Sequence, residues 1–107
     1  MQNKHVFEYA IIRLVPKVER EEFINIGVIL FCKKLNCVKV KFTAKTARLE
    51  AFATHTDVEE VLQHMQAFGR IANGEKDSGP IGELDEASRF RWLTATRSTI
   101  LQASKIH

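Results

Sequence analysis

The sequence has few residues of the kinds that mark special structural classes. Only two cysteines and two prolines occur in 107 residues, which excludes a disulfide-rich or a proline-rich chain. The longest apolar run, residues 26–32, is far too short to cross a bilayer, and the N-terminus lacks the apolar core of a signal peptide. We therefore expect a cytoplasmic protein without membrane contact, whose cysteines are thiols.

Sequence motifs for catalysis and for cofactor binding are also missing. The chain has no glycine-rich phosphate loop, no G-x-S-x-G sequence and no H-E-x-x-H sequence. Its four histidines are scattered, and together with Cys32 and Cys37 they lack the spacing of a metal site. We therefore expect no metal and no cofactor, and the sequence gives an enzyme no support.

The composition that remains is that of an ordinary globular domain. Hydrophobic residues make up 45% and charged residues 27% of a chain long enough to bury a core by itself. A net charge of +3 is too small to decide between a nucleic-acid partner and any other partner. We expect one domain over residues 1–107.

Three strands are expected in the N-terminal half. Residues 6–15 and 24–33 are apolar on both faces, which is typical of strands covered twice, by helices or by a partner subunit. In the second of these strands we expect one face to hold Ile24, Ile26, Val28 and Leu30 and the other to hold Ile29 and Phe31. Residues 37–42 alternate apolar residues with lysines, which favours an edge strand with one face in water.

The C-terminal half predicts helices, a loop and a last strand. After a weakly helical stretch at 45–52, helical spacing of apolar residues predicts a helix over 58–72, capped by Thr56 or Asp57 and ended by Asn73 and Gly74. Residues 73–83 hold three glycines and a proline, so we expect a flexible loop. A shorter helix over about 85–93 follows, with Asp85 as its N-cap, and residues 98–106 are expected to form the last strand.

The order of these elements predicts an α+β domain. Its sheet would be an antiparallel meander of the three N-terminal strands plus the C-terminal strand, with about two helices packed on one face. The last strand is expected on the open side of the first strand, because the lysine-bearing third strand is already at an edge.

Asn25 and Gly27 interrupt an apolar strand and raise the question of a functional site. Both are expected on one face of the strand, opposite Ile24, Ile26 and Val28. A glycine beside a side-chain amide most often marks a β-bulge or a close backbone crossing, which is the interpretation that we favour.

The functional interpretation places a site where the second strand and the last strand begin. Its candidate binding residues are Glu22, Asn25, Gly27, Arg97, Ser98 and Gln102. Glu22 would be a base or hydrogen-bond acceptor, Asn25 would orient a ligand, and Gly27 would allow a close approach of the backbone. Arg97 would hold an anion between two polar neighbours.

Basic residues around the third strand suggest a second possible surface. They are Lys33, Lys34, Lys39, Lys41, Lys45 and Arg48. A phosphate backbone would find donors there, but the outward face lacks aromatic side chains on which bases could stack. We therefore favour a solvated edge strand over a nucleic-acid site.

Three segments of the chain carry a family resemblance. They are YAIIRLVP at 9–16, EEFINIGVILF at 21–31 and WLTATRSTILQAS at 92–104, and residues 22–28 are the most specific part. Together they resemble the bacterial family known as domain of unknown function 3037, over nearly the whole chain. The sequence departs from the family pattern at Thr96, where a proline is usual, and relatives continue past residue 107 with a segment expected to be helical.

The resemblance implies an accessory role rather than a reaction, because the family has no established activity. Members are often encoded beside kinase-like proteins of the HipA type, which makes such a kinase a candidate partner. The first hypothesis is thus a non-enzymatic protein-binding module, with a protein partner or a second copy covering apolar strands. A small enzyme or anion-binding protein with a site near Asn25 and Arg97 is the alternative, and nucleic-acid binding is the third.

Overall fold

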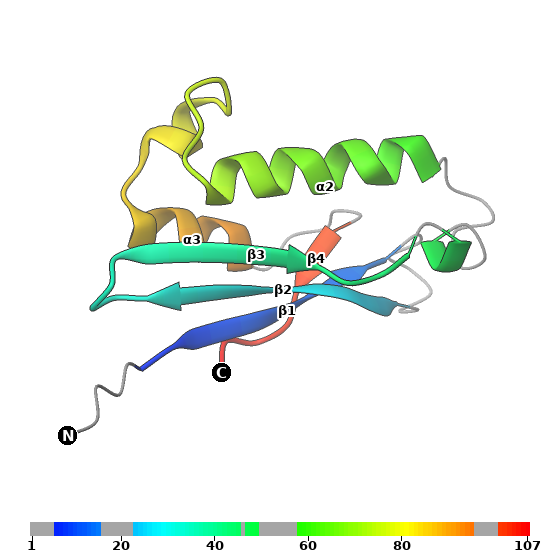
Figure 1. The fold of residues 1–107 in the computed structure, drawn as a ribbon, viewed down its shortest axis with the longest axis horizontal. Coiled ribbons are helices and arrows are strands. Elements are labelled where there is room, and N and C mark those ends of the chain that lie inside the picture. Colours follow the sequence, from blue (N-terminus) through cyan, green and yellow to red (C-terminus); the bar gives the residue numbers. More distant parts are fainter. Residues whose placement is uncertain (1–5, 16–22, 46, 50–57, 96–100) are drawn as a thin grey trace.

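The fold is an antiparallel sheet of four strands with helices on one face (Figure 1). The computed structural model describes residues 6–15, 23–45, 47–49, 58–95 and 101–107. Its strands are β1 (Glu8–Leu14), β2 (Ile24–Cys32), β3 (Cys37–Phe42) and β4 (Leu101–Ala103). Its helices are α2 (Val58–Ala72), the short 3-10 helix η2 (Pro80–Glu83) and α3 (Glu86–Thr94), and residues 47–49 are also helical.

The strand order β3-β2-β1-β4 confirms the α+β meander that the sequence predicts. β2 pairs with β1 and β3, and β4 pairs with β1 on the side away from β2, as expected. The loop expected at 73–83 contains turns and η2. In this order β3 is an edge strand, and it lies beside α2.

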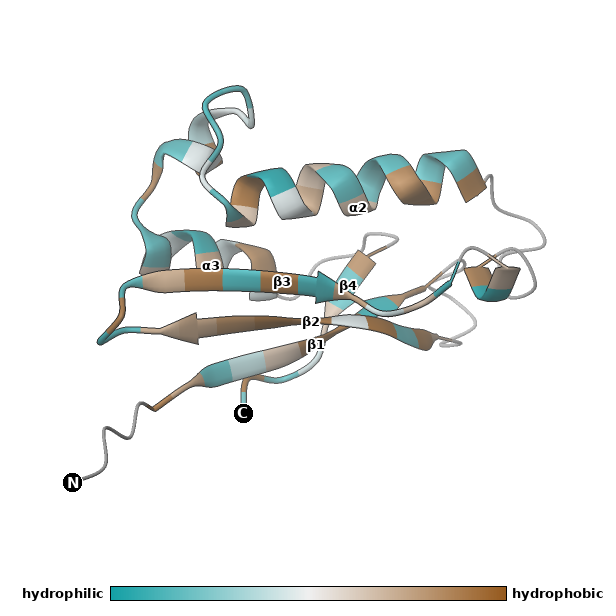
Figure 2. Cartoon of the chain, in the orientation of Figure 1, coloured by the Kyte–Doolittle hydropathy of each residue, from teal (hydrophilic) through white to brown (hydrophobic). Residues whose placement is uncertain are grey.

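The core lies between the sheet and the helices α2 and α3 (Figure 1). Figure 2 shows β2 as apolar along most of its length, which is why it occupies a central place in the sheet. Ile12 and Leu14 of β1 are fully buried, and the rings of Phe31 and Phe90 stack at 5.3 Å and join β2 to α3. Each fully buried leucine or isoleucine contributes about 1.5–3 kcal/mol to stability.

The end of α2 lies at Asn73 and Gly74, as the sequence indicates. Gly74 has a φ of 65°, in the left-handed region that glycine adopts easily. Its N–H donates to the carbonyl of Ile71, and the N–H of Glu75 donates to the carbonyl of Arg70. These two hydrogen bonds form a Schellman motif, which turns the chain back along the helix. The capping residues predicted at 56 and 57 lie outside the described ranges.

The start of α3 is fixed by the predicted N-cap. The carboxylate of Asp85 accepts the backbone N–H of Ser88 at 2.8 Å. Hydrogen bonds from the side chain and then from the backbone of Ser88 lower the pKa of Asp85, because they favour its charged form. Phe90 and Leu93 of α3 are buried as expected. The adjacent carboxyl groups of Asp85 and Glu86 therefore lie at the start of a helix that packs into the core.

β2 contains a β-bulge at Ile26. Ile12 of β1 pairs with Gly27, but the next residue, Arg13, pairs with Asn25, so that Ile26 is the extra residue of β2. The structural interpretation of the interrupted strand, a bulge beside a glycine, is therefore confirmed.

The bulge also corrects the expected faces of β2. Ile26 and Ile29 are both fully buried in the core, whereas Val28 and Leu30 are half-buried on the opposite face. One extra residue reverses the alternation of a strand, because side chains follow a strict period of two. The shared face expected for Ile24, Ile26, Val28 and Leu30 is therefore wrong, as is the shared face expected for Asn25 and Gly27.

Gly27 lies where β3 passes very close to β2. A Cβ atom at Gly27 would lie 2.5 Å from the carbonyl oxygen of Lys41 and 2.9 Å from Cδ1 of Phe42. Real Cβ atoms do not approach other atoms so closely, so the ring of Phe42 occupies the space of the missing side chain. The glycine thus permits the close crossing and sets the position of an aromatic ring.

The last residues of the chain cover the open side of β1. Ser104 donates its N–H to the carbonyl of Ile11 at 2.8 Å, and its hydroxyl accepts the N–H of Ile11 at 2.9 Å. Tyr9 and His107 exchange two backbone hydrogen bonds, and their rings stack at 5.1 Å. The side of β1 away from β2 is therefore paired, and the two edge strands of the described sheet are β4 and β3.

The central part of the sheet face away from the helices is apolar and partly exposed. Tyr9 is 39% exposed, and Ile11, Val28 and Leu30 are half-buried. No helix of the described residues lies over this face (Figure 1). The central strands are apolar on both faces, as expected, and the described helices cover one of them.

The two glycines at 27 and 69 should respond in opposite directions to the same substitution. Gly27→Ala should lower the free energy of unfolding by about 1–3 kcal/mol, because the new methyl group overlaps β3. Gly69→Ala, within α2, should raise it by about 0.5–1 kcal/mol, because alanine favours a helix and nothing lies within 4 Å of the new Cβ. Urea denaturation of both variants checks this, and a neutral Gly27→Ala would contradict the close crossing.

Candidate functional site

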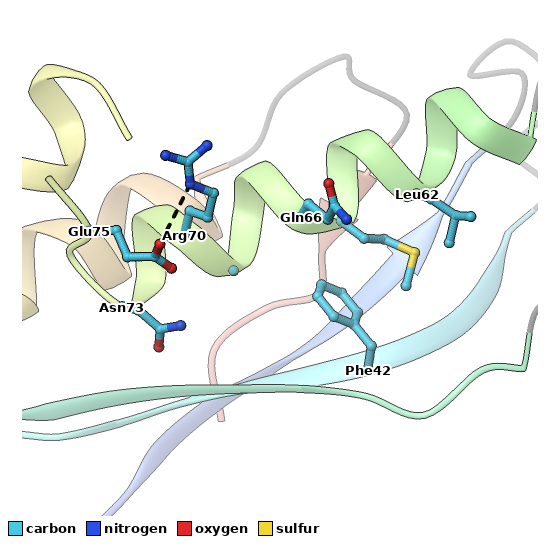
Figure 3. A pocket seen from close by; sticks show the side chains of 8 residues that line it. Phe42, Leu62, Gln66, Arg70, Asn73 and Glu75 are labelled. Atoms are coloured by element: carbon cyan, nitrogen blue, oxygen red, sulfur yellow. Dashed lines mark ion pairs between the residues drawn. The ribbon is translucent and has the colours of Figure 1, made fainter. Parts of the chain in front are cut away.

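An open groove of about 490 Å³ runs between α2 and the edge strand β3 (Figure 3). The two elements lie side by side and run in opposite directions (Figure 1). Phe42 lines the groove from β3, and the other lining residues come from α2 and the turn that follows it. A groove between a helix and an edge strand is a site at which proteins bind extended segments.

Phe42 forms the floor of the groove and is held from two sides. Its ring lies over Gly27 and meets the ring of Phe68 edge-on, with 6.2 Å between the ring centroids. Leu62 and Met65 of α2 complete the apolar part of the lining, and both are only half-buried. These side chains offer an apolar surface that remains accessible from outside.

The helix wall of the groove contains an unusual residue, Gly69. The lining positions 62, 65, 66 and 69 follow the helical spacing of one face of α2, and position 73, just after the helix, continues it. Glycine within a helix costs about 0.5–1 kcal/mol relative to alanine, and no neighbouring atom would contact a Cβ at this position. The fold therefore does not need the glycine, whereas the groove gains space from it.

The far end of the groove is polar. The Nε of Arg70 lies 3.7 Å from Oε1 of Glu75, and both side chains are about half exposed (Figure 3). An ion pair in such contact with water contributes about 0–1 kcal/mol to stability. Together with Asn73, this pair supplies hydrogen-bonding groups at the groove end without being needed to hold the fold.

One side of β3 carries backbone groups that face away from the sheet. Thr43 donates its N–H to the carbonyl of Ile26 on β2, so Lys41 and Lys39 also direct their backbone groups toward β2. The intervening residues Val40 and Phe42 must then direct theirs outward. No described strand pairs with β3 on that side.

The surroundings of β3 are strongly basic. All six basic residues named above for this region are exposed, and residues 33–49 contain no aspartate or glutamate. Lys39 and Lys41 lie on the face away from the helices, while Val38 and Phe42 join the apolar core side. The edge thus combines an apolar groove on one face with positive charge on the other.

Three of the six sequence-predicted site residues are described by the structure. Asn25 and Gln102 lie on the sheet face away from the helices and flank Arg13 of β1, which pairs with both of them. Gly27 lies on the other face, under Phe42. Glu22, Arg97 and Ser98 lie outside the described residues.

Arg13 is a residue that the sequence reasoning missed. Its guanidinium Cζ lies 4.4 Å from the centroid of the Phe23 ring, and its Nε is buried without a hydrogen-bond partner. The sequence feature that could have identified it is that Arg13 is the only charged residue in the apolar segment YAIIRLV. We call Gln102, Arg13 and Asn25 the arginine row.

Comparison with known proteins gives one match. A family model described as "Protein of unknown function (DUF3037)" covers residues 9–107. The chain belongs to the DUF3037 family. Searches of curated proteins and of solved structures found no match. The resemblance carried by three sequence segments is thus confirmed. Because the family description names no activity, only the residues of this DUF3037 protein indicate its chemistry.

Other features of the DUF3037 chain narrow the sites to be considered. Cys32 and Cys37 lie opposite each other on β2 and β3, and both are free thiols. Cys32 is buried and Cys37 is partly buried. Within the described ranges, no three histidine, cysteine, aspartate or glutamate residues gather into a possible metal site. No described helix is both long and apolar enough to cross a membrane. Among the described residues, the groove and the arginine row are the two candidate binding sites that we consider further.

Proposed function

We propose that this chain is a non-enzymatic protein-binding module that receives its partner in the groove between α2 and β3. The observation that carries the proposal is an accessible apolar groove beside a strand edge whose outward backbone groups pair with none of the described strands. Unpaired strand edges are normally avoided or guarded, because they invite pairing with other chains. A partner that fills this groove would satisfy the edge.

A protein partner suits the groove better than a small molecule or a nucleic acid. Small-molecule sites usually enclose most of the ligand surface, whereas this groove is largely open to solvent. Its floor of Phe42, Leu62 and Met65 matches apolar side chains rather than phosphates. A HipA-type kinase is the first bait to test on the strength of the family resemblance, and the encounter would take place in the bacterial cytoplasm.

Filling the groove should abolish partner capture without harming the fold. Gly69→Leu places a large side chain on the groove wall, and it should raise the unfolding midpoint because leucine favours a helix over glycine. We expect the tagged Gly69→Leu chain to lose at least about tenfold of the partner that the wild-type chain co-purifies from its native host, a loss of about 1.4 kcal/mol or more in binding.

Ala67→Leu is the matched control for this experiment. It adds the same side chain to an exposed position of α2, two residues away and outside the groove lining. Capture should survive Ala67→Leu and fail with Gly69→Leu. Equal capture by both variants, or a wild-type chain that is monomeric by solution mass and binds no protein, would refute the groove as the binding site.

The arginine row supports a second candidate function, the binding of an anion. Arg13 is the only group of the row with a buried polar atom known to lack a hydrogen-bond partner among the described residues. A carboxylate or phosphate group could accept from the Nε of Arg13 and from the amide groups of Asn25 and Gln102 on either side. This site lies on the opposite sheet face from the groove.

Inorganic phosphate is the probe for the arginine row. If the row binds anions, phosphate should raise the melting temperature of the wild-type chain at constant ionic strength, since a ligand of the native state stabilises it. Arg13→Met should lose this response, because it keeps the apolar stem and removes the guanidinium. Arg91→Met removes the same charge from an exposed position on α3 and should keep the response. An equal response in all three chains would exclude the site.

A further inference from the structure

We propose that the partner segment joins the sheet as an extended strand beside β3, and that it alternates acidic with apolar residues. The inference rests on the proposed function and specifies the kind of segment that the groove receives. It follows from three features of β3: the direction of its backbone groups, the different chemistry of its two faces, and the lack of acidic residues between positions 33 and 49.

The backbone of β3 is already arranged as a template for a strand. Val40 and Phe42 direct their N–H and C=O groups away from β2, because Lys39, Lys41 and Thr43 use theirs toward it. A strand of six residues offers about 20 Å of such an edge. An extended segment can pair with it through main-chain hydrogen bonds alone, whatever its side chains.

The helix side of the new strand would have to be apolar. Residues opposite each other on paired strands share a face, so the segment residues beside Val40 and Phe42 would point toward α2. There they would meet Leu62 and Met65, and the space left by Gly69 would admit their side chains. Apolar side chains of moderate size fit this position.

The other side of the new strand would have to be acidic. Segment residues beside Lys39 and Lys41 would lie on the face away from the helices, within reach of two exposed ammonium groups. No acidic side chain lies between residues 33 and 49 to neutralise these lysines. Glutamate or aspartate at alternate positions of the segment would therefore pair with them.

The same charges argue against a second copy of the chain as the occupant. Pairing of β3 with the β3 of another copy would bring four lysines together on one face of the joined sheet. Like charges on adjacent strands are destabilising, and edge lysines are a common means of preventing such pairing. The lysines therefore select for an oppositely charged strand.

Short peptides test the inference directly on the whole chain. A hexapeptide that alternates glutamate and valine should bind, and it should slow hydrogen exchange at the amides of Val40 and Phe42. The Lys39→Glu, Lys41→Glu double variant should bind it about tenfold more weakly, because favourable cross-strand pairs become repulsive. The same variant should gain affinity for a hexapeptide that alternates lysine and valine.

N-methylated peptides identify the binding mode. A paired strand directs the N–H groups of alternate residues toward its neighbour. Methylation of the valine nitrogens and methylation of the glutamate nitrogens should therefore have unequal effects, with one form losing binding and the other keeping it. Equal effects of the two methylations, or no protection of Val40 and Phe42 by the unmodified peptide, would overturn strand addition.

Two further outcomes separate this inference from the proposed function. If Gly69→Leu abolishes partner capture but the glutamate–valine peptide protects no β3 amide, the groove binds a partner in another way and the strand inference is wrong. If Gly69→Leu leaves partner capture intact, the proposed function is wrong. Binding of single-stranded RNA or DNA that is lost in the lysine double variant, but is unaffected by Gly69→Leu, would reassign the basic edge to nucleic acid and overturn the inference.

Discussion

The absent side chain at Gly27 is the constraint on which the candidate groove depends. β3 runs so close to β2 there that a Cβ at Gly27 would overlap the carbonyl of Lys41 and the ring of Phe42. The ring of Phe42 can therefore lie next to Gly27 and meet Phe68, which leaves it as the groove floor between the edge strand and α2. The bulge at Ile26 places Gly27 on this face instead of beside Asn25. A local irregularity of one strand thus determines the binding surface formed with its neighbour.

Local sequence patterns were sufficient to predict the four strands, the helices α2 and α3 and their order, whereas η2 lies where a loop was expected. The pattern of α2, the cap at Asp85, and the alternation of lysines in β3 each express a local physical rule, and each is found in the structure. Local sequence patterns could not predict which side chains of β2 share a face, because a bulge changes the register without changing the composition of the strand. The sequence shows that a glycine and an asparagine interrupt β2, but which residue is the extra one depends on the partner strand.

The candidate site was harder to predict, because its parts are far apart in the sequence. Phe42 and Gly69 are separated by 27 residues, and neither has a chemical signature that marks a site. Glycine in a helix is usually read as a packing requirement, and only the empty space around Gly69 excludes that explanation. Arg13 was missed for a related reason: an arginine in a strand is common, and its alignment with Asn25 and Gln102 requires the pairing on both sides of β1.

The pairing of β1 with residues 101–107 has a consequence for synthesis on the ribosome. β1, β2 and β3 are all made before residue 43, but the strand that covers β1 is made some sixty residues later. The growing chain therefore exposes two sheet edges for the time needed to add those residues, at about 5–20 residues per second. When Ser104 and His107 reach β1, they pair with its exposed side, and the three-residue strand β4 becomes the edge strand there. From that moment the longer of the two edge strands is β3, with six residues against three in β4, and it is the one that carries the lysines.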